Sequence, residues 1–334
     1  MRAMVLHAPM PVDACPLTAA ERAVPEPGRG EILVRVGACS VCRTDLHLVE
    51  GDLPLVRSPL VPGHQIVGRV EEVGPGATRF HPGARVGIGW LRWACGGCPF
   101  CRSGRENLCE RAAFTGYHAD GGFAEYAVVP DAFAYAIPDA FGDVEAAPLL
   151  CAGIIGYRAL RLSGVGRTGR LGMYGFGSSA HITLQVAVAR DSEVYICTRD
   201  AAHRALARSL GAVWVGDLAD AMPAPADGII VFAPAGELVP RALRNLAPGG
   251  RLVLAGIYMT AVPALEYADL YRERTITSVT ANTRADGEEF LAEAARIPIR
   301  PAVTTFNLGE ANRALGLLKR GGLAGSGVLV PDRV

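Results

Sequence analysis

Four cysteines in one short window are the residues of this chain best suited to metal chemistry. Cys95, Cys98, Cys101 and Cys109 are separated by two, two and seven residues. Four thiolates on one loop are the ligands of a closed tetrahedral zinc site. Iron clusters use the same ligands at other spacings, and buried free cysteines would not be spaced so regularly on a polar loop. Since four thiolates leave no position for water or substrate, the window predicts a structural zinc.

A second set of possible ligands is dispersed along the chain. Cys42 stands in Cys-Arg-Thr-Asp-Leu-His, His64 in Pro-Gly-His-Gln and Cys151 in Leu-Leu-Cys-Ala-Gly. Taken singly, a cysteine is more often a small apolar core residue, and a histidine more often a satisfied polar group. Two thiolates and one imidazole together leave one coordination position open, which is the arrangement of catalytic zinc.

A glycine pattern indicates a nucleotide site. Gly175, Gly177 and Ala180 form Gly-x-Gly-x-x-Ala directly after an expected strand and at the start of an expected helix. In this context the first glycine makes the turn, the second lets backbone amides approach a pyrophosphate, and the small third residue allows close helix packing. A simple turn is the alternative in a chain with 40 glycines.

Length and charge limit the classes of protein to which the chain can belong. The 334 residues predict about two domains, and 33 basic against 33 acidic side chains give no field for a nucleic acid or a membrane surface. Lys319 is the one lysine, which disfavours Schiff-base chemistry. The amino terminus lacks the features of a secretory signal, and the cysteine usage fits a reducing compartment. We therefore expect a cytoplasmic protein.

The elements that must position these residues follow two patterns. From Met1 to about Pro138, short alternating apolar runs broken by glycine and proline predict an all-β region, with strands over Ile32–Val36, Gln65–Val73 and Ala84–Ile88. From about Ala147, strands alternate with helices, which predicts a parallel sheet covered on both faces. These elements are the strands 170–176, 193–198, 228–232, 251–257 and 275–280 and the helices 179–189, 201–210 and 237–246. We expect the tail, with two helical stretches and a last strand over 327–330, to return to the first region.

Together these motifs resemble those of the zinc-dependent medium-chain alcohol dehydrogenases, in the same order and over nearly the whole length. The resemblance also covers Pro62–Gly68, Asp120–Tyr126 and Ala147–Gly153. It implies an α/β plus β fold: a GroES-like β-barrel catalytic domain over 1–150, a Rossmann NAD(P)-binding domain over 151–284 and a return to the catalytic domain over 285–334. It also implies a small alcohol or carbonyl substrate and a homodimer or homotetramer.

The same resemblance implies roles for single residues. Cys42, His64 and Cys151 match the catalytic zinc ligands, and the four-cysteine window matches the structural site, which makes two zinc ions per chain. The other matched positions are Thr44, which takes the alcohol proton; His47, which passes it to solvent; Asp45, which orients the histidine ligand; Arg43, which contacts the cofactor pyrophosphate; and Trp90, which is either a wall of the substrate pocket or an ordinary packed aromatic residue.

Two positions depart from the family pattern and keep alternative functions open. Gln65 stands where most members have glutamate, and Ile155 where many have threonine. The leading function is reversible oxidation of a primary or secondary alcohol to an aldehyde or ketone. A zinc-containing NADPH-dependent reductase of conjugated C=C or C=N bonds is the alternative from another reaction class, and a non-catalytic cofactor-binding protein is a third. Retention of Thr44 and His47 favours the first.

The end of the second strand of the cofactor domain bears on cofactor choice. An acidic residue there accepts hydrogen bonds from the 2′-hydroxyl of NAD, but this strand ends in Thr198-Arg199. Asp200 comes one position later, where it fits a helix cap. Thr198 and Arg199 could bind a 2′-phosphate, which favours NADP(H) over NAD(H), unless Arg199 stacks on adenine or points to solvent.

Overall fold

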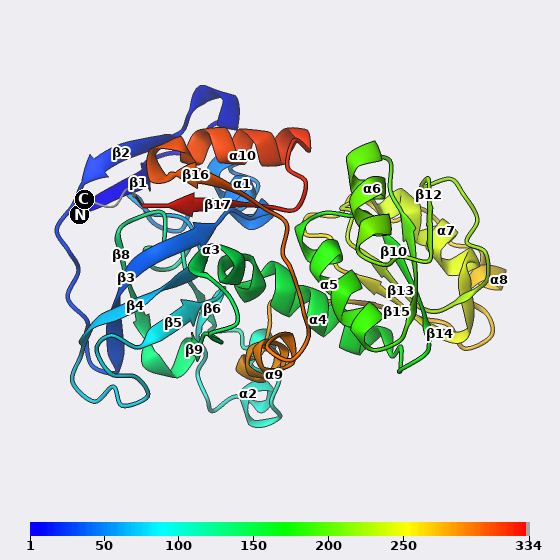
Figure 1. Cartoon of the computed structure of the whole chain (residues 1–334), viewed down its shortest axis with the longest axis horizontal. Helices are drawn as coiled ribbons and strands as arrows, with labels where there is room; N and C mark the ends of the chain where they lie inside the picture. Colours follow the sequence, from blue (N-terminus) through cyan, green and yellow to red (C-terminus); the bar gives the residue numbers. More distant parts are fainter. Residues whose placement is uncertain (332–334) are drawn as a thin grey trace. The chain divides into compact units, whose positions relative to one another are not determined.

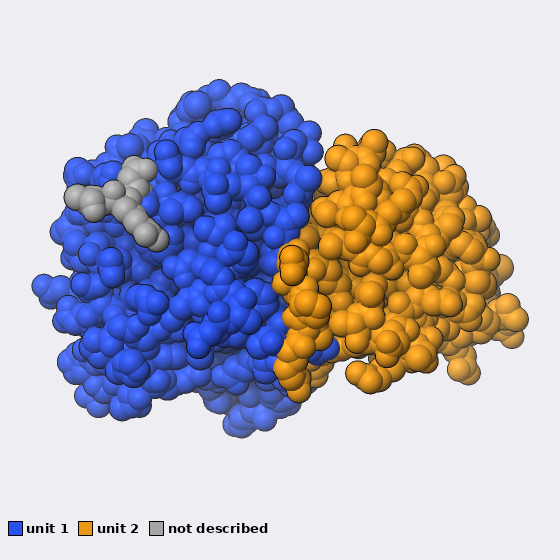
Figure 2. Space-filling view, viewed as in Figure 1, with its two compact units in different colours: residues 1–151, 281–295, 301–334 blue, residues 152–280, 296–300 orange. Residues whose placement is uncertain are grey.

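The structure is a computed structural model that describes residues 1–331. The chain divides into two compact units (Figure 2). Unit 1 contains Met1–Cys151, Ala281–Ala295 and Pro301–Val334, and unit 2 contains Ala152–Thr280 and Arg296–Arg300. The chain therefore leaves unit 1 after Cys151 and comes back to it at Ala281.

Unit 2 is built on a six-stranded parallel sheet, as the alternation of strands and helices predicts. The strand order is β12-β11-β10-β13-β14-β15, and each neighbouring pair is parallel. The strands are β10 (Arg170–Tyr174), β11 (Glu193–Cys197), β12 (Trp214–Gly216), β13 (Ala226–Val231), β14 (Leu246–Leu254) and β15 (Thr275–Ser278). The sequence pattern did not reveal β12, whose three residues are too few for a periodic signal.

Helices cover both faces of this sheet (Figure 1). They are α4 (Ala152–Ser163), α5 (Ser178–Ala189), α6 (Ala201–Ser209), α7 (Val239–Arg244), α8 (Tyr267–Leu270) and the 3-10 turn η5 (Gly236–Leu238). The helix expected over 237–246 is divided between η5 and α7, which begins at Val239 with Pro240 in its first turn. The strand β14 starts at Leu246 rather than 251. Among residues 1–331, no helix has the length and apolar character needed to cross a bilayer.

Unit 1 contains a seven-stranded sheet around an apolar core. The order is β16-β17-β3-β4-β5-β9, and β8 pairs with β3. These strands are β3 (Glu31–Ser40), β4 (Gln65–Val73), β5 (Arg85–Ile88), β8 (Tyr126–Pro130), β9 (Ala134–Ala136), β16 (Val303–Asn307) and β17 (Ser326–Val330). Two small antiparallel pairs join β1 (Arg2–Leu6) with β2 (Leu17–Glu21) and β6 (Leu91–Trp93) with β7 (Ala113–Phe114). The tail strand β17 pairs with β3.

The all-β expectation for the first region is wrong at one important place. Arg43–Glu50 forms an α-helix, α1, because Cys42 and Asp45 make a capping box at its start and Gly51, with φ of 89°, ends it. The other helices of unit 1 are α2 (Pro99–Arg102), α3 (Asp143–Ala146), α9 (Arg284–Ala294), α10 (Ala311–Arg320) and the 3-10 turns η1 (Val12–Ala14), η2 (Glu106–Leu108), η3 (Asp131–Phe133), η4 (Ala147–Leu150) and η6 (Leu308–Glu310).

Candidate active site

The dispersed ligand set converges in unit 1. Cys42 precedes α1, His64 precedes β4, and Cys151 follows η4. One ligand atom from each residue lies within 4.8 Å of the others. The Cys42 and Cys151 sulfurs are 4.0 Å apart, close to the edge of about 3.8 Å expected for a tetrahedron with Zn–S bonds of about 2.3 Å. The spacing of these atoms fits one metal ion.

A carboxylate holds the imidazole in the orientation that a metal ligand needs. Asp45 Oδ1 lies 3.0 Å from His64 Nδ1 and accepts the Gly63 amide at 3.2 Å. Gly63 has φ of 95°, and a Cβ there would lie 2.4 Å from the Phe123 ring, so the turn requires glycine. On the other side of the His64 ring, Nε2 is buried and has no hydrogen-bond partner among the described residues. An unpartnered nitrogen between two cysteines fits a metal-binding role.

When no metal is bound, two of the three ligands favour their charged forms, whereas the hydrogen bond to Cys42, together with burial, raises the pKa of the Cys151 thiol well above its ordinary value. A hydrogen bond from Cys151 holds the pKa of the Cys42 thiol well below its ordinary value. Burial disfavours a charged His64, but Asp45 and Cys42 outweigh it and raise the pKa of His64 to about 10. A metal that binds here must therefore displace the imidazole proton, so its affinity depends on pH.

Three further predicted residues lie on α1. Thr44 is buried, and its hydroxyl oxygen lies 3.8 Å from the Cys42 sulfur. His47 lies in the last turn, where its Nδ1 is 2.8 Å from a carboxylate oxygen of Asp52. Arg43 is exposed at the first helical position. One short helix thus carries the hydroxyl beside the Cys42 sulfur and, one turn later, the imidazole.

Trp90 lies against the ligand set and belongs to an aromatic cluster. Its ring centroid is 4.9 Å from that of His64 in an edge contact, and it stacks on Phe114 at 4.8 Å and Tyr117 at 6.1 Å. Sequence reasoning missed Phe114 and Tyr117, for which the only signal was the density of aromatic residues just after the four-cysteine window. These rings give one side of the ligand set an apolar surface.

The two departures from the family pattern lie at identifiable places. Gln65 is buried, and its amide nitrogen donates to the Ser40 carbonyl at 3.3 Å. It is the first residue of β4, directly after His64. Ile155 is half-buried in the first turn of α4, in unit 2. The charge behind His64 is therefore carried by Asp45, with a neutral amide at the next position.

The four-cysteine window folds into a second ligand set, called here the lobe (Cys95–Cys109). Its four sulfurs lie within 4.8 Å of one another. Backbone amides point at the sulfurs: the Cys98 amide donates to Cys95 at 3.3 Å and the Cys101 amide to Cys98 at 3.4 Å. The Gly97 amide and the Arg111 side chain lower the pKa of Cys95 to about 5. These hydrogen bonds stabilise a thiolate at Cys95, whereas desolvation and the neighbouring Cys98 thiol raise the pKa of Cys101 to about 12. Cysteines supply all four ligands of a tetrahedral site.

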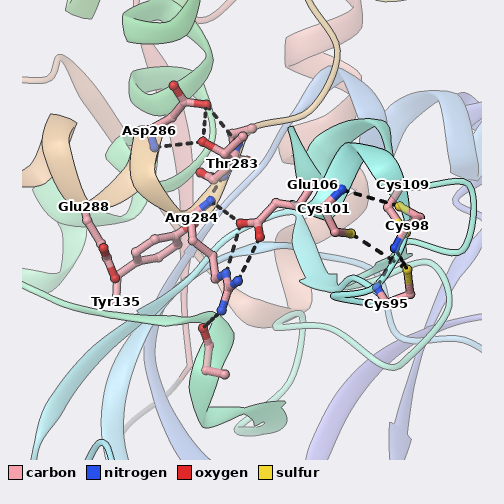
Figure 3. Close-up of polar contacts among 12 residues, drawn as sticks. Cys95, Cys98, Cys101, Glu106, Cys109, Tyr135, Thr283, Arg284, Asp286 and Glu288 are labelled. Carbon is pink, nitrogen blue, oxygen red and sulfur yellow. Dashed lines mark hydrogen bonds and ion pairs between the residues drawn. The ribbon is translucent and has the colours of Figure 1, made fainter. Parts of the chain in front are cut away.

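The lobe is tied to a segment far along the chain (Figure 3). Glu106, between the third and fourth cysteines, accepts hydrogen bonds from the Arg284 amide at 2.8 Å, from Nε at 3.0 Å and from Nη2 at 2.8 Å. Arg284 also lies over the Phe133 ring, 4.7 Å from its centroid. Arg284 is the first residue of α9, which begins with a capping box formed by Thr283 and Asp286. The lobe thus contacts the segment that returns to unit 1.

The glycine pattern forms the expected strand-turn-helix in unit 2. Gly175 follows β10 with φ of 86°, and a Cβ there would lie 2.9 Å from the Ala233 amide. Gly177 is the N-cap of α5, and among residues 1–331 no side chain caps that helix end and no heavy atom lies within 4 Å of a Cβ built on Gly177. Ala180 is fully buried. An open, uncapped helix start fits an anionic group such as a pyrophosphate.

The residues expected near an adenosine ribose lie after β11. Thr198 is 4% exposed, and its amide donates to the Gly216 carbonyl at 3.0 Å. Arg199 is exposed. Asp200 caps α6 by accepting the His203 amide at 2.9 Å, which confirms its expected structural role. No carboxylate therefore stands at the tip of this strand.

The chain is similar to known proteins over almost its whole length. Residues 28–139 match the model of the alcohol dehydrogenase GroES-like domain, and residues 180–296 match that of the zinc-binding dehydrogenases. A probable alcohol dehydrogenase, AdhA, of Mycobacterium tuberculosis is 51% identical over 99% of this chain and 97% of its own length. The chain belongs to the zinc-binding alcohol dehydrogenases. Like the family, it interconverts alcohols with aldehydes or ketones, and the comparisons give no better support to the C=C or C=N reductase.

Two solved structures extend this comparison to cofactor-bound proteins. An acetophenone reductase from Geotrichum candidum in complex with NAD has a TM-score of 0.85 at 25% identity, over 98% of this chain and 96% of its own. A putative zinc-binding dehydrogenase from Sinorhizobium meliloti bound to NADP has a TM-score of 0.85 at 29% identity, over 99% of both chains. Both contain a nicotinamide cofactor, which is NAD in the first and NADP in the second.

Proposed function

We propose that this alcohol dehydrogenase oxidises primary or secondary alcohols with a zinc held by Cys42, His64 and Cys151. The observation that carries this proposal is the buried His64 Nε2, which lies with two sulfurs in one cluster and has no other partner among the described residues. When bound, zinc supplies a Lewis acid and the nicotinamide supplies hydride exchange. The residues of the chain orient the substrate, exclude water and move the proton.

Each residue around the ligand set has a task in this proposal. Asp45 fixes the ring of His64 through Nδ1. Thr44, buried 3.8 Å from the Cys42 sulfur, takes the proton of the alcohol hydroxyl at its own oxygen, and His47 passes the proton to solvent. Trp90 forms an apolar wall against the His64 ring and favours substrates with an apolar chain or ring beside the reacting carbon.

The lobe is proposed to hold the second zinc, with a structural role. All four of its ligands are cysteines, and the amide-to-sulfur hydrogen bonds support bound thiolates. Two zinc ions per chain follow from the two ligand sets.

We further propose that unit 1 is the catalytic domain and unit 2 the cofactor domain. The open start of α5 at Gly175, Gly177 and Ala180 would receive the pyrophosphate. The exposed Arg199 and the missing carboxylate at the end of β11 support NADP(H) over NAD(H). Thr198 is buried, so Arg199 is the main candidate for a 2′-phosphate contact.

A homo-oligomer and a cytoplasmic location complete the proposal. In the described part of unit 2, β15 is an edge strand with three exposed residues out of four, and nearby Tyr267 and Tyr271 are 74% and 61% exposed. An open edge with exposed aromatic residues fits pairing with a second copy, as a dimer or within a tetramer. Nine cysteines without a disulfide fit a reducing compartment.

A substrate panel tests the reaction. Small alcohols, aldehydes, ketones and enals are assayed by the absorbance of the reduced nicotinamide, with either cofactor. We expect turnover of alcohols and carbonyls, and no reduction of the conjugated C=C bond of enals. Cys42→Ser should abolish turnover with the fold intact, whereas Cys15→Ser, a matched change at an exposed cysteine outside both ligand sets, should not. Activity that survives Cys42→Ser, or reduction of enals only at C=C, refutes the proposal.

A further inference from the structure

Asp52 holds the ring of His47 although no motif of the sequence singles it out. Asp52 Oδ2 lies 2.8 Å from His47 Nδ1. Gly51 ends α1 in the left-handed conformation, and the Leu53 amide donates back to the His47 carbonyl at 3.0 Å. This tight turn folds the residues after the helix over its last turn. The contact is therefore built by the local backbone, not by a chance meeting of long side chains.

The contact selects one tautomer of the ring. An ionised carboxylate can only accept hydrogen bonds, so the proton of a neutral His47 must be on Nδ1. The other nitrogen, Nε2, is then the one with a lone pair, and it faces away from Asp52 across the ring. A carboxylate that fixes the tautomer of a histidine and stabilises its imidazolium form is a recurrent way to make histidine an effective base.

We propose that Asp52 is a positioning residue for the proton relay of this enzyme, acting through His47. The inference rests on the proposed relay role of His47. During alcohol oxidation, His47 takes one proton at Nε2 and becomes an imidazolium, whose positive charge Asp52 stabilises. The imidazolium then gives the Nε2 proton to water, which leaves the neutral ring with its proton on Nδ1, held by Asp52. No oxidation or reduction occurs in these steps.

Exposure agrees with a relay that ends in solvent. The His47 side chain is 14% exposed, whereas that of Asp52 is 52% exposed. The carboxylate that holds the ring is therefore in contact with bulk water. Asp52 is half in solvent and caps no helix, so its main contact in the structure is the imidazole that it holds.

The neighbouring charges are engaged elsewhere and provide a matched control. The helix α10 and the turn η1 pack against α1. Lys319 of α10 pairs with Glu50 at 2.7 Å, and Arg320 pairs with Asp13 of η1 at 3.0 Å. Asp13→Asn thus removes a carboxylate from the same surface without a contact to His47.

The test uses the full-length, zinc-loaded enzyme with ¹⁵N-labelled histidine. The seven histidines give few signals, and His47→Gln assigns the one of interest. We expect the neutral His47 of the parent to carry its proton on Nδ1, Asp52→Asn to produce a mixture of tautomers, and Asp52→Glu to restore the parental signal. Asp13→Asn should leave it unchanged.

Single-turnover kinetics give the second readout. We expect Asp52→Asn to slow the first turnover of alcohol oxidation about 3- to 10-fold, with half-saturation by alcohol changed less than about twofold, and Asp52→Glu to recover most of the rate. A parent with the proton on Nε2, or a tautomer or rate untouched by Asp52→Asn, overturns the inference. If the parent oxidises no alcohol, the proposed function fails. The tautomer measurement then still tests whether Asp52 fixes the tautomer of His47.

Discussion

The contact between the lobe and the return segment predicts a large loss of stability from one substitution. Arg284→Ala removes the Nε and Nη2 bonds to Glu106 and the contact with the Phe133 ring, but keeps the backbone amide bond. It leaves a carboxylate whose side chain is only 11% exposed without its cation. The chain must then hold an uncompensated, nearly buried charge inside the lobe.

The magnitude follows from the burial of the two partners. Removal of one partner from a fully buried pair costs about 3 to 5 kcal/mol, whereas exposed pairs contribute about 0 to 1 kcal/mol. Glu106 is close to the first case, but Arg284 is 41% exposed and is screened by water. We therefore expect Arg284→Ala to lower the free energy of unfolding by about 2 kcal/mol, and the thermal midpoint by about 4 to 8 °C.

Acid should reduce the difference in stability between the parent and Arg284→Ala. Burial raises the pKa of Glu106, but the hydrogen bonds from Arg284 outweigh it and hold the pKa below its ordinary value. A carboxylate with a lowered pKa in the folded state contributes stability above its unfolded pKa of about 4.3 and loses it as the pH falls through the folded pKa. The difference in free energy of unfolding between the parent and Arg284→Ala should therefore become smaller below about pH 4. Both proteins lose metal in acid, so comparing them cancels that effect.

The assay combines a double-mutant cycle with hydrogen exchange. Glu106→Gln, Arg284→Ala and the double variant are unfolded at fixed zinc, and their coupling should be about 1 to 2 kcal/mol. Amides of α9 should exchange faster in Arg284→Ala, and those of α5 should not change. Glu71→Gln, which breaks an exposed pair with Arg35, is the control and should stay within about 0.5 kcal/mol of the parent. If the losses of unfolding free energy in the two single variants simply add up in the double variant, the reasoning is refuted.

The other predictions concern metal, catalysis and cofactor. Elemental analysis of dialysed enzyme should find two zinc ions per chain. Cys98→Ser should lower heat stability before activity, because structural zinc contributes folding free energy. A Cys98→Ser variant that is heat-stable but inactive would mean that the lobe is the catalytic site and not the structural one. Gln65→Glu should change kcat/KM for carbonyl reduction about 10-fold or more with the fold intact, and unchanged constants would make Gln65 a neutral replacement. Arg199→Ala should lower the preference for NADPH in the ratio of kcat/KM values; a parent that prefers NADH contradicts the assignment.

Features that are local in sequence could be predicted well. The parallel sheet of unit 2 was predictable because each strand is a short apolar run followed by a turn and an amphipathic or buried helix. The first glycine turn was predictable because its conformation depends on neighbours within six residues. The lobe was predictable for the same reason, since its four ligands lie in one window.

Features that depend on distant partners could not be predicted from these patterns. The helix α1 has few apolar residues in a glycine-rich and proline-rich region, so the strand signals around it dominated. The strand β16, Val303–Asn307, exists because β17 pairs with it. Glu106 and Arg284 are 178 residues apart, and each is an ordinary charged residue until the return of the chain brings them together.

Asp45 shows why the sequence did not predict α1, although its resemblance to the family predicted a role for Asp45 beside His64. Its Oδ2 accepts the Cys42 amide at 2.8 Å and completes the capping box of α1, while its Oδ1 lies 3.0 Å from His64 Nδ1. The resemblance to the family identified the second contact, but the first was hidden because cysteine, unlike serine or threonine, is not read as a helix cap. One carboxylate therefore fixes the start of α1 and the ring of a proposed metal ligand. The helix that carries Thr44 and His47 is thereby held in register with His64, so we expect loss of Asp45 to displace the proposed ligand and the proposed proton relay together.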